Sequence, residues 1–279
     1  MAHRARTASS RRRGGRLSVR QAVALGLIQG PAEVLPVSSS GHLVLIPALL
    51  DWPYAHLPAD VRKAFEVALH TGAGAALALL LRADVAAAIR NPKRTALLAG
   101  PAATVAFALE DPIERHASSP RVAAIAQIAA GAALGATGRI PKRVAWPLTR
   151  AKGGRPPLWA SDFLVGIAQI AALVPGVSRN GATLTAARAL GFDREAAARI
   201  SWQAGLPIIG GATVLKLFRL TQRGLDRELR APFAAGAAAA FAATLAAAPL
   251  LRVRHQRVIA AYRIALGAFA LHRLEWPRG

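Results

Sequence analysis

The sequence predicts an all-α, polytopic helical membrane protein in which two broken helices belong to an internal repeat. First, 53% of the 279 residues are hydrophobic and the mean hydropathy is +0.32, which is too apolar for an ordinary soluble domain. Second, a formal net charge of +22 is carried by basic clusters that lie between the apolar stretches. Third, two apolar stretches are interrupted at matching positions by proline, glycine and serine.

Apolar segments that approach the length of a membrane-spanning helix recur along the chain. A spanning helix needs about 20 predominantly apolar residues, and several of these segments are short or rich in alanine. Their repetition and their basic borders therefore carry the prediction more than any single segment does. In order, the predicted spans are residues 21–50, 64–81, 95–110, 121–137, 158–190, 199–219, 232–250 and 258–274.

The chain divides into a basic tail and one membrane domain. We expect residues 1–18 to be a disordered cytoplasmic tail, because they are too basic and too short of apolar residues for a signal peptide. Residues 19–279 are predicted to form a single integral membrane domain. Its halves cover about 20–137 and 158–275, and the basic loop 138–157 joins them.

The basic excess fits a membrane surface better than nucleic acid. Lys and Arg flank the predicted spans, as expected from their preference for cytoplasmic loops and anionic lipid headgroups. They are not interleaved with aromatic residues that would stack on bases, so we expect no nucleic-acid partner. The chain has no cysteine, which excludes a disulfide framework and a thiolate metal site.

The two long, interrupted segments match each other at one constant offset. Each copy reads Gly-x-x-Gln and then, after a gap, Val-Ser-x-x-Gly. The offset is 140 for every pair, as in 166 − 26 and 181 − 41, which indicates duplication rather than chance similarity. The pairs are Gly26 with Gly166, Gln29 with Gln169, Val37 with Val177, Ser38 with Ser178, and Gly41 with Gly181.

Helix breakers in the middle of both copies free backbone polar groups. Hydrocarbon does not satisfy such groups, so broken helices occur where they line a protein-walled or watery cavity. Paired interruptions in two halves predict a binding site near the repeat interface. The orientation stays open: if every span crosses, the basic loops 82–94 and 139–155 are cytoplasmic, but the basic run 252–257 lies outside, against the positive-inside preference. Re-entrant segments would change the count.

The stretch GPAEVLPVSSSGHLVL, residues 30–45, carries candidate catalytic residues. A carboxylate at membrane depth is costly and functional by default, so Glu33 is a candidate, and Gln29 shares its helix face. His42 follows three serines, 38–40, and could act as nucleophile, acid or base, or could activate a serine. The structural alternatives are serines that only cap the next helix and a histidine that is merely packed.

The second copy, PGVSRNGAT at residues 175–183, supplies a cation. The planar guanidinium of Arg179 suits phosphate oxygens. Ser178 and Asn180 lie beside it, and the flanking glycines permit close backbone approach. The alternatives are that Arg179 reaches to the membrane interface or forms a structural ion pair with Glu33. No GxxxxGK[ST] motif occurs, so nucleotide binding has no support.

Taken together, the two copies offer the residues that phosphoryl transfer needs. Glu33, helped by Gln29, could hold a divalent cation, Mg²⁺ or Ca²⁺, through oxygen ligands. Such a cation shields phosphates and polarises the scissile bond, while Arg179 would neutralise the developing charge. In a membrane, the simplest substrate with this chemistry is a lipid phosphate or diphosphate.

At these residues the sequence resembles the undecaprenyl-diphosphate phosphatase family of bacterial membranes, also known for bacitracin resistance. The first and fourth motifs are specific, and the others alone are weak. The matching segments, which cover about residues 20–272, are QGPAEVLPVSSSGHLVL (29–45), FEVALHTGAGAALALLLR (65–82), LLAGPAATVAFALEDPIE (97–114), ALVPGVSRNGATLTAARALGFDREAAARISWQAGLPIIGGA (172–212) and YRIALG (262–267).

The resemblance implies hydrolysis of undecaprenyl diphosphate to undecaprenyl phosphate and inorganic phosphate, which recycles the carrier lipid for peptidoglycan synthesis. It implies a multi-pass protein of the bacterial plasma membrane, a divalent cation, an outward-facing active site, and two re-entrant segments in an inverted repeat. Gln29 and Glu33 occupy its metal-binding motif, and Ser39 and His42 its nucleophile and acid–base positions, with the assignment between them open. With Arg179, the expected phosphate- and substrate-binding residues are Ser38, Ser40, Gly41, Ser178, Asn180 and Gly181.

Three departures from the family pattern bear on the expected chemistry. Gln29 stands where an acidic residue is usual, which removes one anionic ligand but keeps a carbonyl oxygen. Asn180 replaces a serine and can still donate to phosphate, and residues 200–207 match loosely. Two other functions stay open at this point, namely a flippase of the carrier lipid, which broken helices also suit, and a non-catalytic lipid-binding scaffold. A homodimer is compatible with the sequence.

Overall fold

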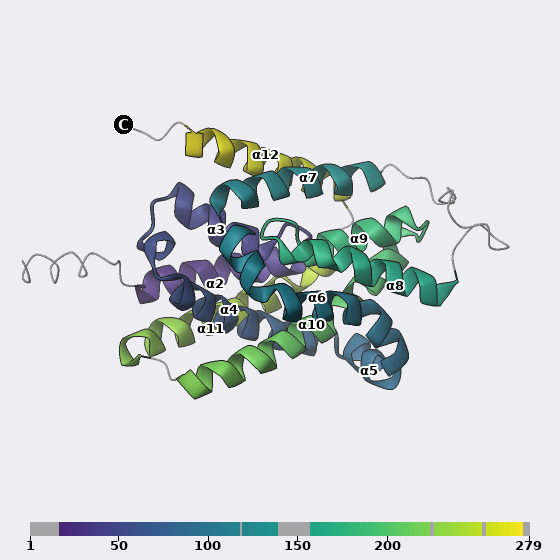
Figure 1. The fold of residues 1–279 in the computed structure, drawn as a ribbon, viewed down its shortest axis with the longest axis horizontal. Coiled ribbons are helices and arrows are strands. Elements are labelled where there is room, and N and C mark those ends of the chain that lie inside the picture. The colour runs from purple at the N-terminus through teal and green to yellow at the C-terminus, as the bar shows by residue number, and fades with distance from the viewer. Residues whose placement is uncertain (1–16, 118, 139–156, 224–225, 253–254, 276–279) are drawn as a thin grey trace, which may run out of the picture.

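The computed structural model describes residues 17–117, 119–138, 157–223, 226–252 and 255–275, and they fold as a layered bundle of helices (Figure 1). Residues 1–16 of the predicted tail and most of the predicted basic loop fall outside the described residues, whereas Leu17 is buried and Ser18 caps α2, so these two residues are not disordered as predicted. No strand occurs within the described ranges, as the all-α prediction requires. The elements are α2 (Val19–Val34), α3 (Ser39–Leu49), the 3₁₀ helix η2 (Pro53–His56), α4 (Ala59–Leu80), α5 (Arg82–Arg90), α6 (Pro92–Ala117), α7 (Pro120–Thr137), α8 (Leu158–Gln169), the 3₁₀ helix η3 (Ile170–Leu173), α9 (Arg179–Ala189), α10 (Arg194–Arg223), α11 (Arg227–Ala246), the 3₁₀ helix η4 (Ala248–Arg252) and α12 (Gln256–Glu275).

Every predicted span falls on helix, and one segment expected to be a loop is helical as well. Residues 82–90 form α5, which continues from α4 after a bend of 86°. The loop prediction rested on charge, but the sequence RADVAAAIR is rich in alanine, which has the highest helix propensity. The basic residues here therefore lie on a short surface helix.

Helix formation and membrane crossing are separate questions for these segments. Within the described part of the chain, α11 is the one helix long and apolar enough on its own to cross a membrane. The bent pair α4 and α5 raises this number to two if it forms one span. The helices of the predicted spans are thus confirmed, and the number of crossings stays a prediction.

Both interrupted segments are broken helices, as predicted. In the first, α2 ends at Val34 and α3 begins at Ser39. Leu35 is extended at the break, as expected for a residue that precedes proline. In the second, α8 passes through η3 into a loop that α9 follows.

Each half of the repeat contributes a first helix that packs against the other half. Helix α2 lies along α11, and α8 lies along α6. The repeat-related glycines explain the close packing, because a Cβ at Gly26 would overlap the carbonyl oxygen of Gly236, and one at Gly166 would overlap that of Leu97. Helices α7 and α12, which end the two halves, run side by side (Figure 1).

Candidate active site where two broken helices meet

The two loops of the broken helices share a positive φ at one pair of equivalent residues. Ser38 has φ 74° and Ser178 has φ 71°, a left-handed conformation that side chains other than glycine rarely adopt. Each serine hydroxyl also accepts a hydrogen bond from the backbone N–H three residues later, at Gly41 or Gly181. The capping role considered for serines 38–40 is therefore confirmed at Ser38, and Ser178 caps the second helix in the same way. Strain at equivalent positions marks the two loops as functional candidates.

Glu33, near the end of α2, is the centre of the first set of side chains. It is 6% exposed, and its Oε2 accepts a hydrogen bond of 2.6 Å from the Ser39 hydroxyl. The amide of Gln29 donates to the same oxygen at 3.2 Å. His70 of α4 places Nδ1 3.5 Å from Oε2. A buried carboxylate thus lies in direct contact with a serine hydroxyl, the arrangement that a general base needs.

Arg179, the first residue of α9, joins the second loop to this carboxylate. Its Nη2 lies 2.9 Å from Glu33 Oε1, so the ion pair considered as an alternative is present. Its Nη1 is buried and has no hydrogen-bond partner among the described residues. A Cβ at Gly205 of α10 would overlap Nη1, so the guanidinium occupies space that only glycine leaves at that position. One nitrogen of the fork therefore pairs with Glu33, and the other is buried without a partner.

His42 has partners that differ from those expected of a histidine that activates a neighbouring serine. Its Nδ1 lies 2.7 Å from the carbonyl oxygen of Ser38, which can only accept. In the neutral ring Nδ1 therefore carries the hydrogen, and Nε2 accepts from the Tyr262 hydroxyl at 2.7 Å. In the structure the hydrogen-bond partner of the Ser39 hydroxyl is Glu33, and that of His42 Nε2 is Tyr262.

The other predicted residues divide between the loops and their supports. Ser40 Oγ lies 3.3 Å from Ser38 Oγ. The amide nitrogen of Asn180 donates to the carbonyl of Val34 at 3.1 Å, and its oxygen accepts from Ser201 at 2.6 Å. Asn180 therefore joins α9 to α2 and α10, and the contact with substrate expected of it stays a prediction.

Three further elements complete the site with residues that sequence reasoning missed. Helix α4 supplies His70, α7 supplies Gln127, and α12 supplies Tyr262 and Arg263. His70 lies in the motif FEVALHTG and the α12 pair begins the motif YRIALG, so the signal was present in two of the weak motifs. The Gln127 position carries no signal in the sequence.

The two residues predicted to hold a divalent cation, Gln29 and Glu33, lie on one turn of α2. No group of three His, Asp or Glu side chains is close enough to form an all-protein metal site in the described ranges. Gln29 Oε1 is buried without a hydrogen-bond partner among the described residues, and the nitrogen of the same amide donates to Glu33. Mg²⁺ commonly binds one or two protein oxygens and completes its ligands with water and substrate phosphate. The donor set fits a cation shared with a phosphate substrate.

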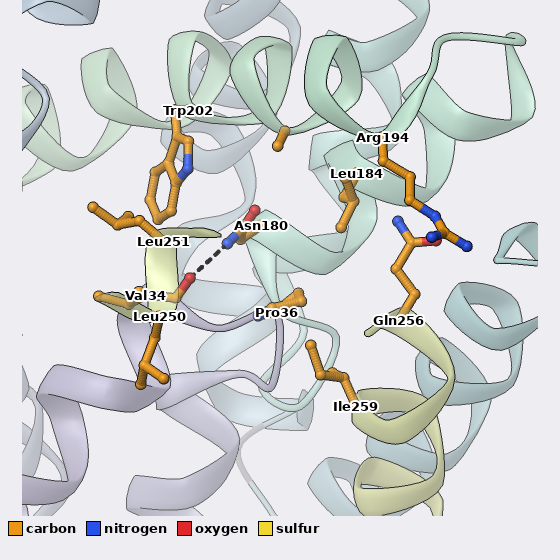
Figure 2. A pocket seen from close by; sticks show the side chains of 11 residues that line it. Val34, Pro36, Asn180, Leu184, Arg194, Trp202, Leu250, Leu251, Gln256 and Ile259 are labelled. Carbon is orange, nitrogen blue, oxygen red and sulfur yellow. Dashed lines mark hydrogen bonds between the residues drawn. The ribbon is translucent and has the colours of Figure 1, made fainter. Parts of the chain in front are cut away.

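A pocket lies behind the loops and does not contain the acid–base residues (Figure 2). Figure 2 shows the hydrogen bond from Asn180 to Val34 at its wall, with Trp202 above and Gln256 and Arg194 at one side. Apolar side chains of η4 and α12 supply much of the remaining lining. Glu33, Ser39 and His42 are absent from its lining.

Known proteins with similar sequences cover almost the whole chain. The family model described as bacitracin resistance protein BacA matches residues 22–269. The undecaprenyl-diphosphatase of Trichlorobacter lovleyi is 39% identical over 267 residues, which are 88% of this chain and 93% of that protein. Those of Geobacter sulfurreducens and Thermomicrobium roseum are each 38% identical, over 85% and 94% of this chain and 90% and 100% of their own lengths.

Proposed function

This chain belongs to the family of the bacitracin resistance protein BacA, and from that premise we propose that it acts as a membrane undecaprenyl-diphosphatase. It hydrolyses undecaprenyl diphosphate to undecaprenyl phosphate and inorganic phosphate. The observation that carries the chemistry is the contact of Ser39 with Glu33, itself paired to an arginine that keeps a free, buried nitrogen. The relatives named as phosphatases favour this activity over lipid transport.

Ser39 is the nucleophile in this mechanism. Its hydroxyl donates to Glu33 over 2.6 Å, so the carboxylate takes the proton as the bond from Oγ to the terminal phosphorus forms. The bond from that phosphorus to the bridging oxygen breaks, and undecaprenyl phosphate leaves. Water then attacks the phosphorus of the phosphoserine, the bond from Oγ to phosphorus breaks, and Glu33 returns its proton to Oγ, while the proton lost by the water leaves with inorganic phosphate or through His42.

Arg179, which follows the second loop, neutralises the charge of the transferred phosphoryl group. Arg179 is held by Glu33 through one nitrogen and offers the other to a phosphate oxygen. The N-termini of α3 and α9 add free backbone N–H groups and the positive ends of two helix dipoles. Donors placed in advance where charge develops lower the barrier, because they need no reorganisation during the reaction.

His42 and Tyr262 form a second acid–base pair beside the nucleophile. The hydrogen bond of Nδ1 to the Ser38 carbonyl fixes the ring, and the phenol covers Nε2. His42 therefore serves the proton transfers of the leaving group or the attacking water rather than the activation of Ser39. Tyr262 is 46% exposed, so this pair has access to a proton from outside the core.

Glu33 and Gln29 are the residues that would hold a divalent cation, Mg²⁺ or Ca²⁺. Their support is that the Gln29 oxygen is buried without a partner, on an amide whose nitrogen contacts Glu33. When bound, the cation supplies charge neutralisation for the diphosphate. Because Gln29 gives no negative charge, we expect the cation to bind more weakly than at a pair of carboxylates.

We place the chain in the plasma membrane as a multi-pass protein whose site opens outward, with the two broken segments re-entrant in an inverted repeat. The supports are the helical content, the family, and the matching positive φ of Ser38 and Ser178 at the 140-residue offset.

The test is inorganic phosphate release from undecaprenyl diphosphate by the purified protein in detergent. We expect release with Mg²⁺ or Ca²⁺ and its loss with chelator, since the diphosphate and Glu33 need a shared counter-charge. Folding is followed by thermal unfolding in the same samples. Folded protein that releases no phosphate under any of these cations contradicts the assignment, and release that persists with chelator contradicts the cation alone.

A further inference from the structure

Arg263 of α12 is a completely buried cation at the point where the two loops meet. It is 0% exposed, the largest fully buried side chain in the described part of the molecule. No ion pair with a carboxylate is found for it in the described ranges, although transfer of an unpaired guanidinium from water is costly. A group kept at such a cost has a structural or functional task to perform.

All three nitrogens of this guanidinium are used for hydrogen bonds to neutral oxygens. Its Nη1 donates to the carbonyl of Pro36 at 2.9 Å. Its Nη2 donates to the carbonyls of Gly176 and Val177, each at 2.7 Å. Pro36 and Gly176 are equivalent in the repeat, since 36 + 140 = 176. One arginine therefore binds the same backbone position of both loops, with one arm for each copy.

Gln127 of α7 orients this arginine and extends the same network. Its Oε1 accepts from Arg263 Nε at 2.9 Å, and its Nε2 donates to the Val37 carbonyl at 2.8 Å. The glycines of the loops leave the space, because a Cβ at Gly181 would lie 2.7 Å from Arg263 Nη1 and one at Gly41 3.0 Å from Gln127 Nε2. The backbone carbonyls freed by the helix breaks are thus satisfied from α7 and α12.

The loops that these two residues hold carry the catalytic candidates on opposite sides. The first loop leads directly into Ser39 and the second into Arg179. Their separation fixes how far the nucleophile lies from the cation that stabilises the phosphoryl group. A misplacement of about 1 Å at such a distance can reduce turnover about 100-fold.

We infer that Arg263, oriented by Gln127, is a positioning residue that holds the two halves of the active site in register. The inference rests on the proposed function for its kinetic consequence but not for its geometry. The task requires the planar fork, because three carbonyls of two loops must be reached from one group. A lysine would keep the charge but has a single nitrogen on a flexible stem.

The test compares Arg263→Lys with Arg188→Lys. Arg188 is a matched control, since it is also buried, at 3% exposed, and binds a backbone carbonyl, that of Phe192 at 2.6 Å, at the other end of α9. We expect Arg263→Lys to lower kcat for phosphate release about 100-fold with KM changed little. Arg188→Lys should keep the kcat of the unmodified chain. Equal kcat in the two folded variants overturns the inference.

Gln127→Met provides a milder variant that keeps the side-chain length. It should lower kcat about 10-fold, and the double variant with Arg263→Lys should be no slower than Arg263→Lys alone, because both act through one contact. If Arg263→Lys fails to fold, the kcat of Gln127→Met tests the positioning role in its place. An unchanged kcat in folded Gln127→Met, or fully additive losses in the double variant, counts against the positioning role.

A distance measurement separates this inference from the proposed function. The chain has no cysteine, so spin labels can be placed at Leu35→Cys and Val174→Cys, one beside each loop, without background. We expect a narrow distance distribution that broadens in Arg263→Lys and not in Arg188→Lys. If the unmodified chain releases no phosphate but only Arg263→Lys broadens the distribution, the clamp that Arg263 and Gln127 form on the two loops is confirmed and the proposed activity is contradicted. A distribution that Arg263→Lys leaves unchanged contradicts the clamp whatever the activity.

Discussion

Two arginine–carboxylate pairs in this molecule look alike and differ in what they leave unused. In one, Arg94 binds both oxygens of Asp162, at 2.9 and 3.2 Å, and its remaining nitrogen donates to Gln203 at 2.7 Å. In the other, Arg179 binds one oxygen of Glu33 and leaves a buried nitrogen without a partner in the described residues. Both carboxylates are nearly fully buried, at 4% and 6% exposed.

The difference shows how a structural ion pair can be told from a functional one. Each nitrogen of the Arg94 guanidinium has a hydrogen-bond partner, so this group joins α6, α8 and α10 and has no nitrogen left over for a ligand. The Arg179 pair is incomplete, and the second oxygen of Glu33 is in contact with a serine hydroxyl. An incomplete buried pair costs stability, so we interpret the missing partner as the place of the substrate.

Substitution of the two carboxylates, Glu33 and Asp162, is expected to give the largest difference between the two pairs. Glu33→Gln removes the base and the charge that holds Arg179, and we expect phosphate release to fall about 1,000-fold or more. Asp162→Asn should keep phosphate release within a few fold and instead lower the free energy of unfolding by about 2 kcal/mol, because it weakens a half-buried pair. Kinetics and thermal unfolding in detergent measure both quantities.

The opposite pattern would show that the distinction between the two pairs is wrong. That pattern is an active Glu33→Gln enzyme of low stability beside an inactive Asp162→Asn enzyme of normal stability.

The two arginines allow a second and smaller test. Arg179→Lys keeps one contact with Glu33 but loses the second donor, so we expect turnover to drop about 100-fold. Arg94→Lys cannot bind Asp162 in a bidentate manner and should chiefly lower stability. Steady-state rates on folded samples distinguish them, and equal loss of turnover in both variants would contradict the assignment of the free nitrogen to the substrate.

The smallest expected effect concerns the space beside Arg179. Gly205→Ala places a methyl group where Nη1 lies, and since the end of a long side chain can move, folding should be little affected. We expect turnover to fall about 10-fold because the guanidinium is displaced. Gly210→Ala on the same helix is the control, since a Cβ there meets nothing within 4 Å. Equal turnover in the two variants would show that Arg179 does not need this position.

The sequence predicted the local features of the site well. Proline, glycine and serine placed both breaks, and the constant offset of 140 predicted two loops of one design, which the equal φ angles of Ser38 and Ser178 match. Glu33, Ser39 and Arg179 do meet, because the two breaks bring their flanking residues together. The assignment of His42 as a partner of serine was open in the sequence, and the structure directs it to Tyr262.

The contacts between distant helices could not be predicted from local patterns. Arg263 is 227 residues from Pro36 and 136 from Gln127 in the chain, and no periodicity records such pairs. From the motif YRIALG alone, Arg263 would be placed near a membrane interface, where the charged ends of such side chains usually lie. Helix α5 was mistaken for a loop because charge outweighed the helix propensity of its alanines.

The clamp on the two loops also sets an order of events during synthesis. Pro36 and Gly176 leave the ribosome before Arg263, so both loops exist for a time without the side chain that joins them. Until α12 packs beside α7, the proposed nucleophile Ser39 and the proposed phosphate-binding Arg179 are not held in register. A nascent chain is therefore expected to be catalytically silent until the helix that carries Arg263 has joined the bundle.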